Sequence, residues 1–405
     1  MKFSAAFVGL VGLAVASPYT EHDTSNGLIA RGVKCDIPRK YMNYPSTPKL
    51  KKYYGHGRTI HVKPGQKIQQ AIKKASPGDR IVVAGGEYSE QLVIDKDGIR
   101  LEGHGATLKS PDPKYLKKNA CTGLTQDPQK NELQAGICIT GYKVKTDDFV
   151  TEHKIVTSVG RPVKGVSVTG FTVQGFSGIN IAILGAKNTY ITNNKLVDGG
   201  AYGALTLGSI NTVFYDNVVT TTKGGFIAIC MDNKSDVFTK KNDISNHLIG
   251  LCVQTNGAVM EYNKLTNNCF GVFVDPGVRE AKIAHNYIGP TPAACDKNSA
   301  GIILGSSIGV LVTDNTIEGQ KASDGSGAGV RIYDDPCIAT PEMPISLSCV
   351  VLGKAIKARD NVVVGNTLNN NDNDIQNLSK GSGNIIKCNT CKNEANIKAG
   401  QCKKP

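Results

Sequence analysis

The sequence has no tryptophan, few aromatic residues and no long apolar run after its first residues. Phenylalanine and tyrosine make up 6% of the 405 residues, which argues against a helical bundle with a bulky core. A membrane-spanning helix needs about 20 consecutive apolar residues, so no membrane span is predicted. Dense basic runs are also missing, and we therefore expect no nucleic-acid partner. Glycine, in contrast, is abundant with 45 residues, as is typical of a chain with many tight turns.

Residues 1–16 have the pattern of a secretory signal peptide. Lys2 supplies the positive start, residues 7–15 the short apolar core, and Ala14-Val15-Ala16 the small-residue cleavage site. We therefore expect a secreted, extracellular protein. Residues 17–58 are predicted to be an N-terminal tail or a pro-segment removed after Arg31, and residues 59–405 to be the folded domain.

All twelve cysteines follow the signal peptide, so we expect disulfide bonds formed in an oxidising compartment. Their pairing cannot be read from the sequence. Cys388 and Cys391 have the spacing of a redox motif but lack its sequence context, and with Cys402 they are predicted to staple a C-terminal cap. Two sequons, at Asn233 and Asn377, predict N-linked glycans.

An asparagine that opens a short apolar run recurs along the chain. The first five intervals are 23, 25, 21, 23 and 29 residues, and the last is 51, which corresponds to two coils with an insertion. Such a period is typical of a stacked solenoid. Asparagine tolerates left-handed turns, and its amide can pair with the asparagines of the coils above and below. The recurring residues are Asn194, Asn217, Asn242, Asn263, Asn286, Asn315 and Asn366.

A second repeated element is a glycine followed by an alternating strand. We expect the first and third residues after each glycine to point inward, and the second and fourth to point outward. The early outward residues, such as Asn180 and Ile229, are mostly apolar and are expected to lie under a loop. Inserted loops that wall a groove are predicted at about residues 111–164, 289–300 and 335–360. The glycines are Gly178, Gly203, Gly225, Gly250, Gly271, Gly301 and Gly329.

The segment from Thr59 to Leu108 combines a short strand, a helix-patterned run from Ile68 to Ala75, and further short strands. This order resembles the N-terminal cap and first coil of right-handed parallel β-helix proteins, a superfold that includes pectate lyases, pectin methylesterases, polygalacturonases and alginate epimerases. The predicted fold is therefore all-β: a single-stranded right-handed parallel β-helix with an N-terminal capping helix, stapled by disulfides. We expect a monomer.

Polar side chains replace apolar ones on the outward positions of the later coils. This cluster, together with a net charge of +13, favours an acidic polysaccharide or a cell-wall surface as the partner. We predict the catalytic residues to be Asp275, Arg331, Tyr333 and Asp334, and the substrate-binding residues to be Asp232, Gln254, Arg279 and Asp335.

These residue types fit uronate chemistry. Arg331 could neutralise the sugar carboxylate, a base such as Asp275 could remove the C5 proton, and Tyr333 could supply one. The stretch Phe270–Gly277 is similar to the Tyr-Gly-Phe-Asp-Pro-His strand of alginate epimerases, but only Asp275 of the active residues carries over. Polygalacturonase-like Gly-His-Gly triplets, at residues 55–57 and 103–105, lie before the repeat. β-Elimination is therefore expected ahead of epimerisation.

Other chemistry stays open for the same cluster. Paired carboxylates could hydrolyse a glycosidic bond or hold Ca²⁺, although the sequence requires no cofactor. The sequences Asp275-Pro276 and Asp334-Asp335-Pro336 also occur in ordinary turns. The alternatives to a lyase are a non-catalytic secreted protein that binds a cell wall or a host surface and, third, a glycoside hydrolase.

Overall fold

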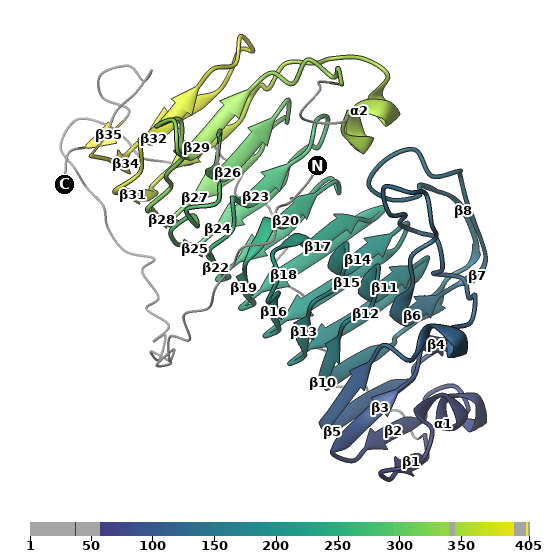
Figure 1. Ribbon diagram of the computed structural model, residues 1–405. Coiled ribbons are helices and arrows are strands. Elements are labelled where there is room, and N and C mark those ends of the chain that lie inside the picture. Colours follow the sequence, from purple (N-terminus) through teal and green to yellow (C-terminus); the bar gives the residue numbers. More distant parts are fainter. Residues whose placement is uncertain (1–36, 38–56, 296, 340–344, 393–401, 404–405) are drawn as a thin grey trace.

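The computed structural model describes residues 37, 57–295, 297–339, 345–392 and 402–403. The predicted signal peptide and most of the predicted tail lie outside the described residues. The described chain is a solenoid whose coils each add parallel strands to two long sheets, one of ten strands and one of 23 (Figure 1). Within the described residues, no helix is long and apolar enough to cross a membrane.

The ten-stranded sheet takes one strand from each coil, and neighbouring strands are parallel. In chain order its strands are β4 (Leu92–Ile94), β6 (Ala135–Thr140), β11 (Ile179–Leu184), β14 (Tyr202–Leu207), β17 (Gly225–Asp232), β20 (His247–Val253), β23 (Phe270–Val274), β26 (Ala300–Gly305), β29 (Ala328–Tyr333) and β32 (Asn373–Asn377).

The 23-stranded sheet follows the rest of each coil. Its strands are β1 (Thr59–Val62), β2 (Arg80–Val83), β3 (Gly86–Ser89), β5 (Arg100–Lys109), β9 (Val163–Lys164), β10 (Ser167–Gln174), β12 (Ala186–Thr192), β13 (Lys195–Val197), β15 (Ile210–Tyr215), β16 (Val218–Thr220), β18 (Ser235–Lys240), β19 (Asp243–Ser245), β21 (Val259–Glu261), β22 (Lys264–Thr266), β24 (Lys282–Ala284), β25 (Tyr287–Ile288), β27 (Leu311–Thr313), β28 (Thr316–Glu318), β30 (Val362–Val364), β31 (Thr367–Asn369), β33 (Ile385–Lys387), β34 (Asn389–Thr390) and β35 (Cys402–Lys403).

Helix α1 (Ile68–Lys74) is the predicted capping helix, and it covers the first coil (Figure 1). Ile68 and Ile72 are buried in the same core as the coil strands. The Glu90 carboxylate accepts a hydrogen bond from the Ile68 backbone N–H at 2.9 Å, which satisfies one of the free N–H groups at the helix start.

The core is a stack of inward rows in which equivalent residues of successive coils lie on one another. One such row is completely buried and consists of Ile181, Ala204, Ile229, Leu251, Val272, Ile302, Val330 and Ile375. Each residue therefore loses its water contact only because a neighbouring coil is present, as in other solenoids.

The sequence-based assignment of faces was wrong for Ile229 and Asn180. Ile229 pairs with Ala204 in the core, and Asn180 is buried with its Nδ2 donating to the Val197 carbonyl at 3.0 Å. For Ile229 the reason is a shift in register: the residue equivalent to Gly203 is Ala228, three positions after Gly225. A shift of this size moves side chains to the opposite face of a strand.

The recurring asparagines form a buried ladder, as predicted. The Nδ2 of Asn194 donates to the Oδ1 of Asn217, that of Asn217 to Asn242, and the pattern continues through successive coils to Asn389. The backbone N–H of each asparagine donates to the same oxygen. The ladder therefore satisfies buried polar groups at the corner between two strands of each coil.

Disulfide bonds staple the described coils, as predicted. The pairs are Cys121–Cys138, Cys230–Cys252, Cys269–Cys295, Cys337–Cys349 and Cys391–Cys402, and Cys388 is also disulfide-bonded.

Two insertions lie beside the ten-stranded sheet. The first contains a 3₁₀ helix (Pro113–Tyr115) and an antiparallel hairpin of β7 (Tyr142–Thr146) and β8 (Val156–Arg161). The second contains α2 (Leu347–Leu352). Figure 1 shows the hairpin and α2 on the side of the ten-stranded sheet. Strand β6 falls inside the predicted insertion 111–164 but belongs to the sheet, so that insertion is shorter than expected.

Candidate functional site

One outward row of the ten-stranded sheet carries polar residues in successive coils. Asp232 pairs with Leu207 of the preceding coil, and the register of β20 and β23 places Gln254 and Asp275 in line with it. Tyr333 pairs with Gly305 in the same line. The structure thus places four of the eight residues that the sequence singled out on one line. We call Asp232, Gln254, Asp275 and Tyr333 the polar row.

The row begins beyond an apolar area that lies under the hairpin. Leu205, Leu207 and Cys252 are buried outside the coil, and Val144 and Val156 of the hairpin pack on this cluster. The expected loop over the early outward residues is therefore present.

The two insertions add polar groups to the row. Gln254 Nε2 donates to Glu152 Oε2 and to Asp275 Oδ2, each at 2.9 Å. Ser348, on α2, donates its Oγ–H to Asp275 Oδ2 at 2.9 Å. The backbone N–H of Leu347 donates to Glu152 Oε1 at 3.1 Å, which ties the two insertions to each other. The row and its covering loops are therefore one hydrogen-bonded unit.

His153 is completely buried in this unit. Its Nε2 lies 2.9 Å from Gln254 Oε1, and its Nδ1 lies 3.1 Å from the Lys154 carbonyl. The Gln254 amide has its nitrogen on two carboxylates, so its oxygen faces the imidazole. Both ring nitrogens of His153 therefore lie within hydrogen-bond distance of oxygen atoms.

The surroundings of two carboxyl groups in the row favour their protonated forms. Burial raises the pKa of Asp275 well above its usual range, and the negative charge of Glu152 adds to this effect. Burial also raises the pKa of Asp232, where attraction by His153 opposes the effect and repulsion by Glu152 adds to it. These shifted groups can deliver or accept protons at a higher pH than exposed aspartates do.

Two tyrosines border the carboxylates. Burial raises the pKa of Tyr202 well above its usual range, as do the charges of Glu152, Asp275 and Asp232, and its hydroxyl has no hydrogen-bond partner among the described residues. Burial also raises the pKa of Tyr333, whose hydroxyl donates to Asp335 Oδ2 at 3.3 Å. Both hydroxyls therefore stay protonated near neutral pH, and each can donate a hydrogen bond.

Arg331 is not free to bind a substrate carboxylate in this structure. Its Nε donates to Gln376 Oε1 at 2.9 Å, and its two terminal nitrogens donate to the carbonyls of Asn298 and Ser326. The side chain is 5% exposed. Arg331 therefore fastens two surface loops to the sheet.

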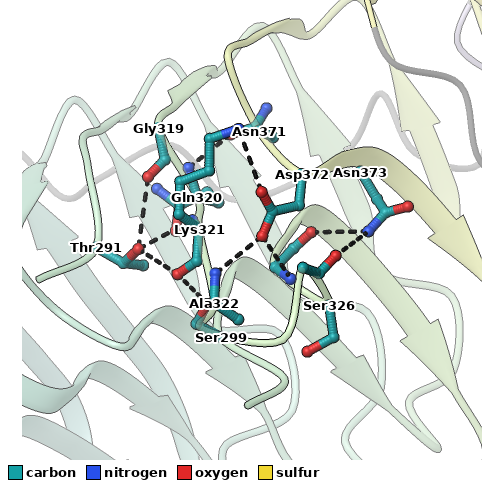
Figure 2. A network of polar contacts seen from close by, with 12 residues as sticks. Thr291, Ser299, Gly319, Gln320, Lys321, Ala322, Ser326, Asn371, Asp372 and Asn373 are labelled. Atoms are coloured by element: carbon teal, nitrogen blue, oxygen red, sulfur yellow. Dashed lines mark hydrogen bonds and ion pairs between the residues drawn. The ribbon is translucent and has the colours of Figure 1, made fainter. Parts of the chain in front are cut away.

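Figure 2 shows a polar network that holds the same two loops. Asp372 Oδ2 accepts hydrogen bonds from the backbone N–H groups of Ala322 at 2.9 Å and Gly327 at 3.1 Å. Thr291 and Ser299 both donate to the Lys321 carbonyl. All of these hydrogen bonds join protein groups to each other, so the network stabilises the loops.

Asp334 and Arg279 lie apart from the polar row. Asp334 accepts hydrogen bonds from the backbone N–H groups of Ala358 and Lys380 and from the Ser379 hydroxyl, which closes the next coil. Arg279 is exposed at a turn, where its backbone N–H donates to Asn256 Oδ1. The structure does not bring either residue to Asp275.

A metal site is not preformed among these carboxylates. Within the described part of the chain, one group of potential ligands lies close together: Asp335, Cys337 and Cys349. The two cysteines form a disulfide and cannot act as thiolates. The possible Ca²⁺ site therefore has no geometric support in the described structure.

The two predicted glycosylation sites differ in exposure. Asn233 is 7% exposed and its Nδ2 donates to Thr212 Oγ1 at 3.0 Å, so a glycan on this nitrogen is incompatible with the folded arrangement. Asn377 is partly exposed at the end of β32 and stays a prediction.

Glu152, His153, Tyr202 and Ser348 were missed by reading the sequence. Three of them come from insertions that have no repeat register, and Tyr202 has the appearance of an ordinary strand residue. The adjacent Glu152 and His153 in an insertion were the available signal.

A family model for the right-handed β-helix region matches residues 131–288. Together with the strand topology, this match shows that the chain has the right-handed parallel β-helix fold. No curated protein matches its sequence. This β-helix protein is similar to a solved mannuronan C-5 epimerase A-module from Azotobacter vinelandii, with 14% identity, a TM-score of 0.49, and 85% of this chain and 98% of that one covered.

Two further solved structures are similar. A family 28 exopolygalacturonase from Yersinia enterocolitica has 13% identity and a TM-score of 0.48, with 84% of this chain and 79% of that one covered. The tailspike protein of Escherichia coli bacteriophage HK620 has 11% identity and a TM-score of 0.48, with 82% and 63% covered. At such identities the likeness concerns the fold alone.

Proposed function

We propose that this β-helix protein is a secreted polysaccharide-active enzyme that uses Asp232 and Asp275 as an acid–base pair. The observation that carries the proposal is their position on one outward row, two coils apart, with Gln254 between them. Strands in a sheet are ~4.8 Å apart, so the two backbones are separated by about 10 Å. Inverting glycosidases hold their two carboxyl groups about 6.5–9.5 Å apart.

The chemistry follows from the environment of each carboxyl group. Asp275 is the more strongly shifted towards its protonated form and would donate its proton to the glycosidic oxygen as that bond breaks. Asp232, whose carboxyl group is influenced by the charge of His153, would take a proton from the attacking water. One proton leaves Asp275 and one arrives at Asp232, and exchange with solvent restores both.

Access to Asp275 requires movement of its cover. The Asp275 side chain is 4% exposed, and Ser348 of α2 is bonded to its carboxylate. Substrate binding must therefore displace α2, as lids and loops do in many enzymes.

β-Elimination ranks below hydrolysis at this site. Elimination from a uronate needs a cation beside the sugar carboxylate, and the Arg331 donors are taken by Gln376 and two backbone carbonyls. The groups that meet at the polar row are mostly acidic and would repel a carboxylate placed among them.

A non-catalytic binding role is the second candidate. It is favoured by the closure of the cluster, in which the bonds of Glu152 and Asp275 end on Gln254, Ser348 and Leu347. Such a protein would bind a polymer or surface without turnover.

The test is an assay of purified protein on a panel of neutral and acidic polysaccharides. Hydrolysis gives new reducing ends without the ultraviolet absorbance of an unsaturated uronate, whereas elimination gives both. We expect Asp275→Asn and Asp232→Asn each to lower the rate by about 100-fold or more, since acid–base groups contribute on that scale. Asp148→Asn, at an exposed loop position, is the matched control. Turnover that survives both substitutions would refute the assignment.

A further inference from the structure

The outer face of the β7–β8 hairpin is basic and exposed. Val144 and Val159 point at the coil, where the Cγ2 atoms of both lie within about 3 Å of the position that a Cβ on Gly185 would take. The opposite side of β7 presents Lys143 and Lys145 to solvent. The hairpin is thus fixed by its inner valines and leaves its basic side chains free to meet a partner.

Charge of one sign dominates the exposed residues of the two hairpin strands. The strands and their continuation, residues 142–146 and 156–164, contain four basic residues and no acidic one. Arg161 is 66% exposed, and its nearest carboxylate contact, with Asp97, is 3.8 Å long. Such a contact in water contributes little, so the Arg161 charge stays available.

The basic surface continues onto the coil. Lys164 of β9 lies directly opposite Lys187 of β12 in the parallel register, and both are exposed. Like charges placed opposite each other on neighbouring strands destabilise a sheet. A bound anion would relieve this repulsion, whereas an unoccupied surface would retain it.

An exposed aromatic ring lies beside Lys143 at the start of the hairpin. Tyr142 is 60% exposed, pairs with Arg161 across the hairpin, and has the Lys143 Nζ 5.3 Å from its ring centre. An aromatic face beside lysine and arginine offers an apolar surface for a sugar ring and cations for its carboxylate.

This surface adjoins the acidic end of the polar row through a single loop. The loop is closed by the Asp147 N–H bond to the Ile155 carbonyl at 2.9 Å, and it carries Glu152 and His153 into the row. A polymer held on the hairpin is therefore held next to the proposed catalytic residues.

We propose that the β7–β8 hairpin is an anchoring surface for a carboxylated, anionic polysaccharide, with Lys143, Lys145 and Arg161 as its cations and Tyr142 as its platform. The choice of a polysaccharide among polyanions rests on the proposed function. The polar row would then act on a segment of the polymer beyond the anchored one. The hairpin, and not the carboxyl groups of the row, would bind the negative charges of the substrate.

The test compares binding of the full chain to immobilised polygalacturonate, to alginate and to a neutral β-glucan. In the triple variant Lys143→Ser, Lys145→Ser and Arg161→Ser we expect about tenfold weaker binding to the acidic polymers, because three exposed cationic contacts are lost. The triple variant Lys195→Ser, Lys223→Ser and Lys380→Ser removes the same charge from exposed sites elsewhere and should bind like the parent.

Three results would overturn the proposal: equal binding by parent and hairpin variant, equal loss in both triple variants, or equal binding of the neutral glucan. Binding of single-stranded DNA as tight as that of polygalacturonate would also reject it, because the surface would then recognise charge alone. Circular dichroism melting of both variants verifies that they are folded.

Failure of the anchor and failure of the proposed function give different results. Asp275→Asn should keep the binding and lose the turnover. Charge-dependent binding without turnover on any polymer would refute the proposed enzymatic function and support the anchoring role of the hairpin. If the hairpin variant turns over an acidic polymer as fast as the parent does, the anchoring role of the hairpin is refuted and the proposed enzymatic function stands.

Discussion

A single buried asparagine in the ladder serves three coils at once. Asn263 accepts the backbone N–H and the Nδ2–H of Asn242 on one side, at 3.0 and 2.9 Å. Its own Nδ2 donates to the Thr239 carbonyl, in the same coil as Asn242, and to Asn286 Oδ1 in the following coil. Because none of these groups can reach water, loss of the amide leaves several buried partners unsatisfied.

Asn263→Ala is therefore expected to lower the free energy of unfolding by about 3 kcal/mol or more, since each unsatisfied buried group costs roughly 1–3 kcal/mol. Urea denaturation followed by circular dichroism measures the effect. Asn256→Ala is the control, because Asn256 is exposed and accepts one backbone bond from Arg279. Equal stabilities for the two variants would show that the ladder is not a source of stability.

At the scale of elements, the repeat made the coils predictable, whereas the residues contributed by the insertions were not predictable. The asparagine period and the alternating strands predict the coils, the inward rows and the line from Gln254 to Asp275, because each coil obeys the same geometry. Glu152 and Ser348 reach that line from insertions whose paths depend on tertiary contacts. Arg331 was misjudged for a related reason: its strand position was predictable, but the loop carbonyls that bind it were not.

Helix α2 acts on the site through one hydroxyl. The Ser348 bond favours the ionised form of Asp275 and so opposes the effect of burial on its pKa. In Ser348→Ala the pKa of Asp275 should rise further, and a general acid would then stay protonated to higher pH. The alkaline limb of the pH–rate profile is therefore expected to shift to higher pH.

Ser346→Ala is the matched control for that experiment. Ser346 caps the same helix by accepting the Cys349 N–H at 3.3 Å, but it does not bond to Asp275. It should weaken α2 without moving the alkaline limb. If the two variants gave the same profile, the effect would come from the helix as a whole and not from the carboxyl group.

For the whole molecule, the buried carboxyl group links stability to pH. The pKa of Asp275 is raised in the folded state, mainly by burial, relative to its ordinary value of 3.8. The folded chain therefore binds this proton more tightly than the unfolded chain does. The stability that results is fully present below the unfolded pKa, and it is lost as pH rises from about 4 through the folded value.

Asp275→Asn should remove this loss, because an amide of the same shape can accept the bonds from Gln254 and Ser348 without carrying charge. The midpoint of thermal unfolding, measured at pH 4, 6 and 8, is expected to be similar to the parent's at pH 4 and higher by a few degrees at pH 8. Asp148→Asn, at an exposed position, should track the parent throughout. If the unfolding midpoints of variant and parent differ by the same amount at every pH, Asp275 is not the group whose proton links stability to pH. A variant that gains stability while losing turnover would mark Asp275 as a residue kept for chemistry at the expense of the fold.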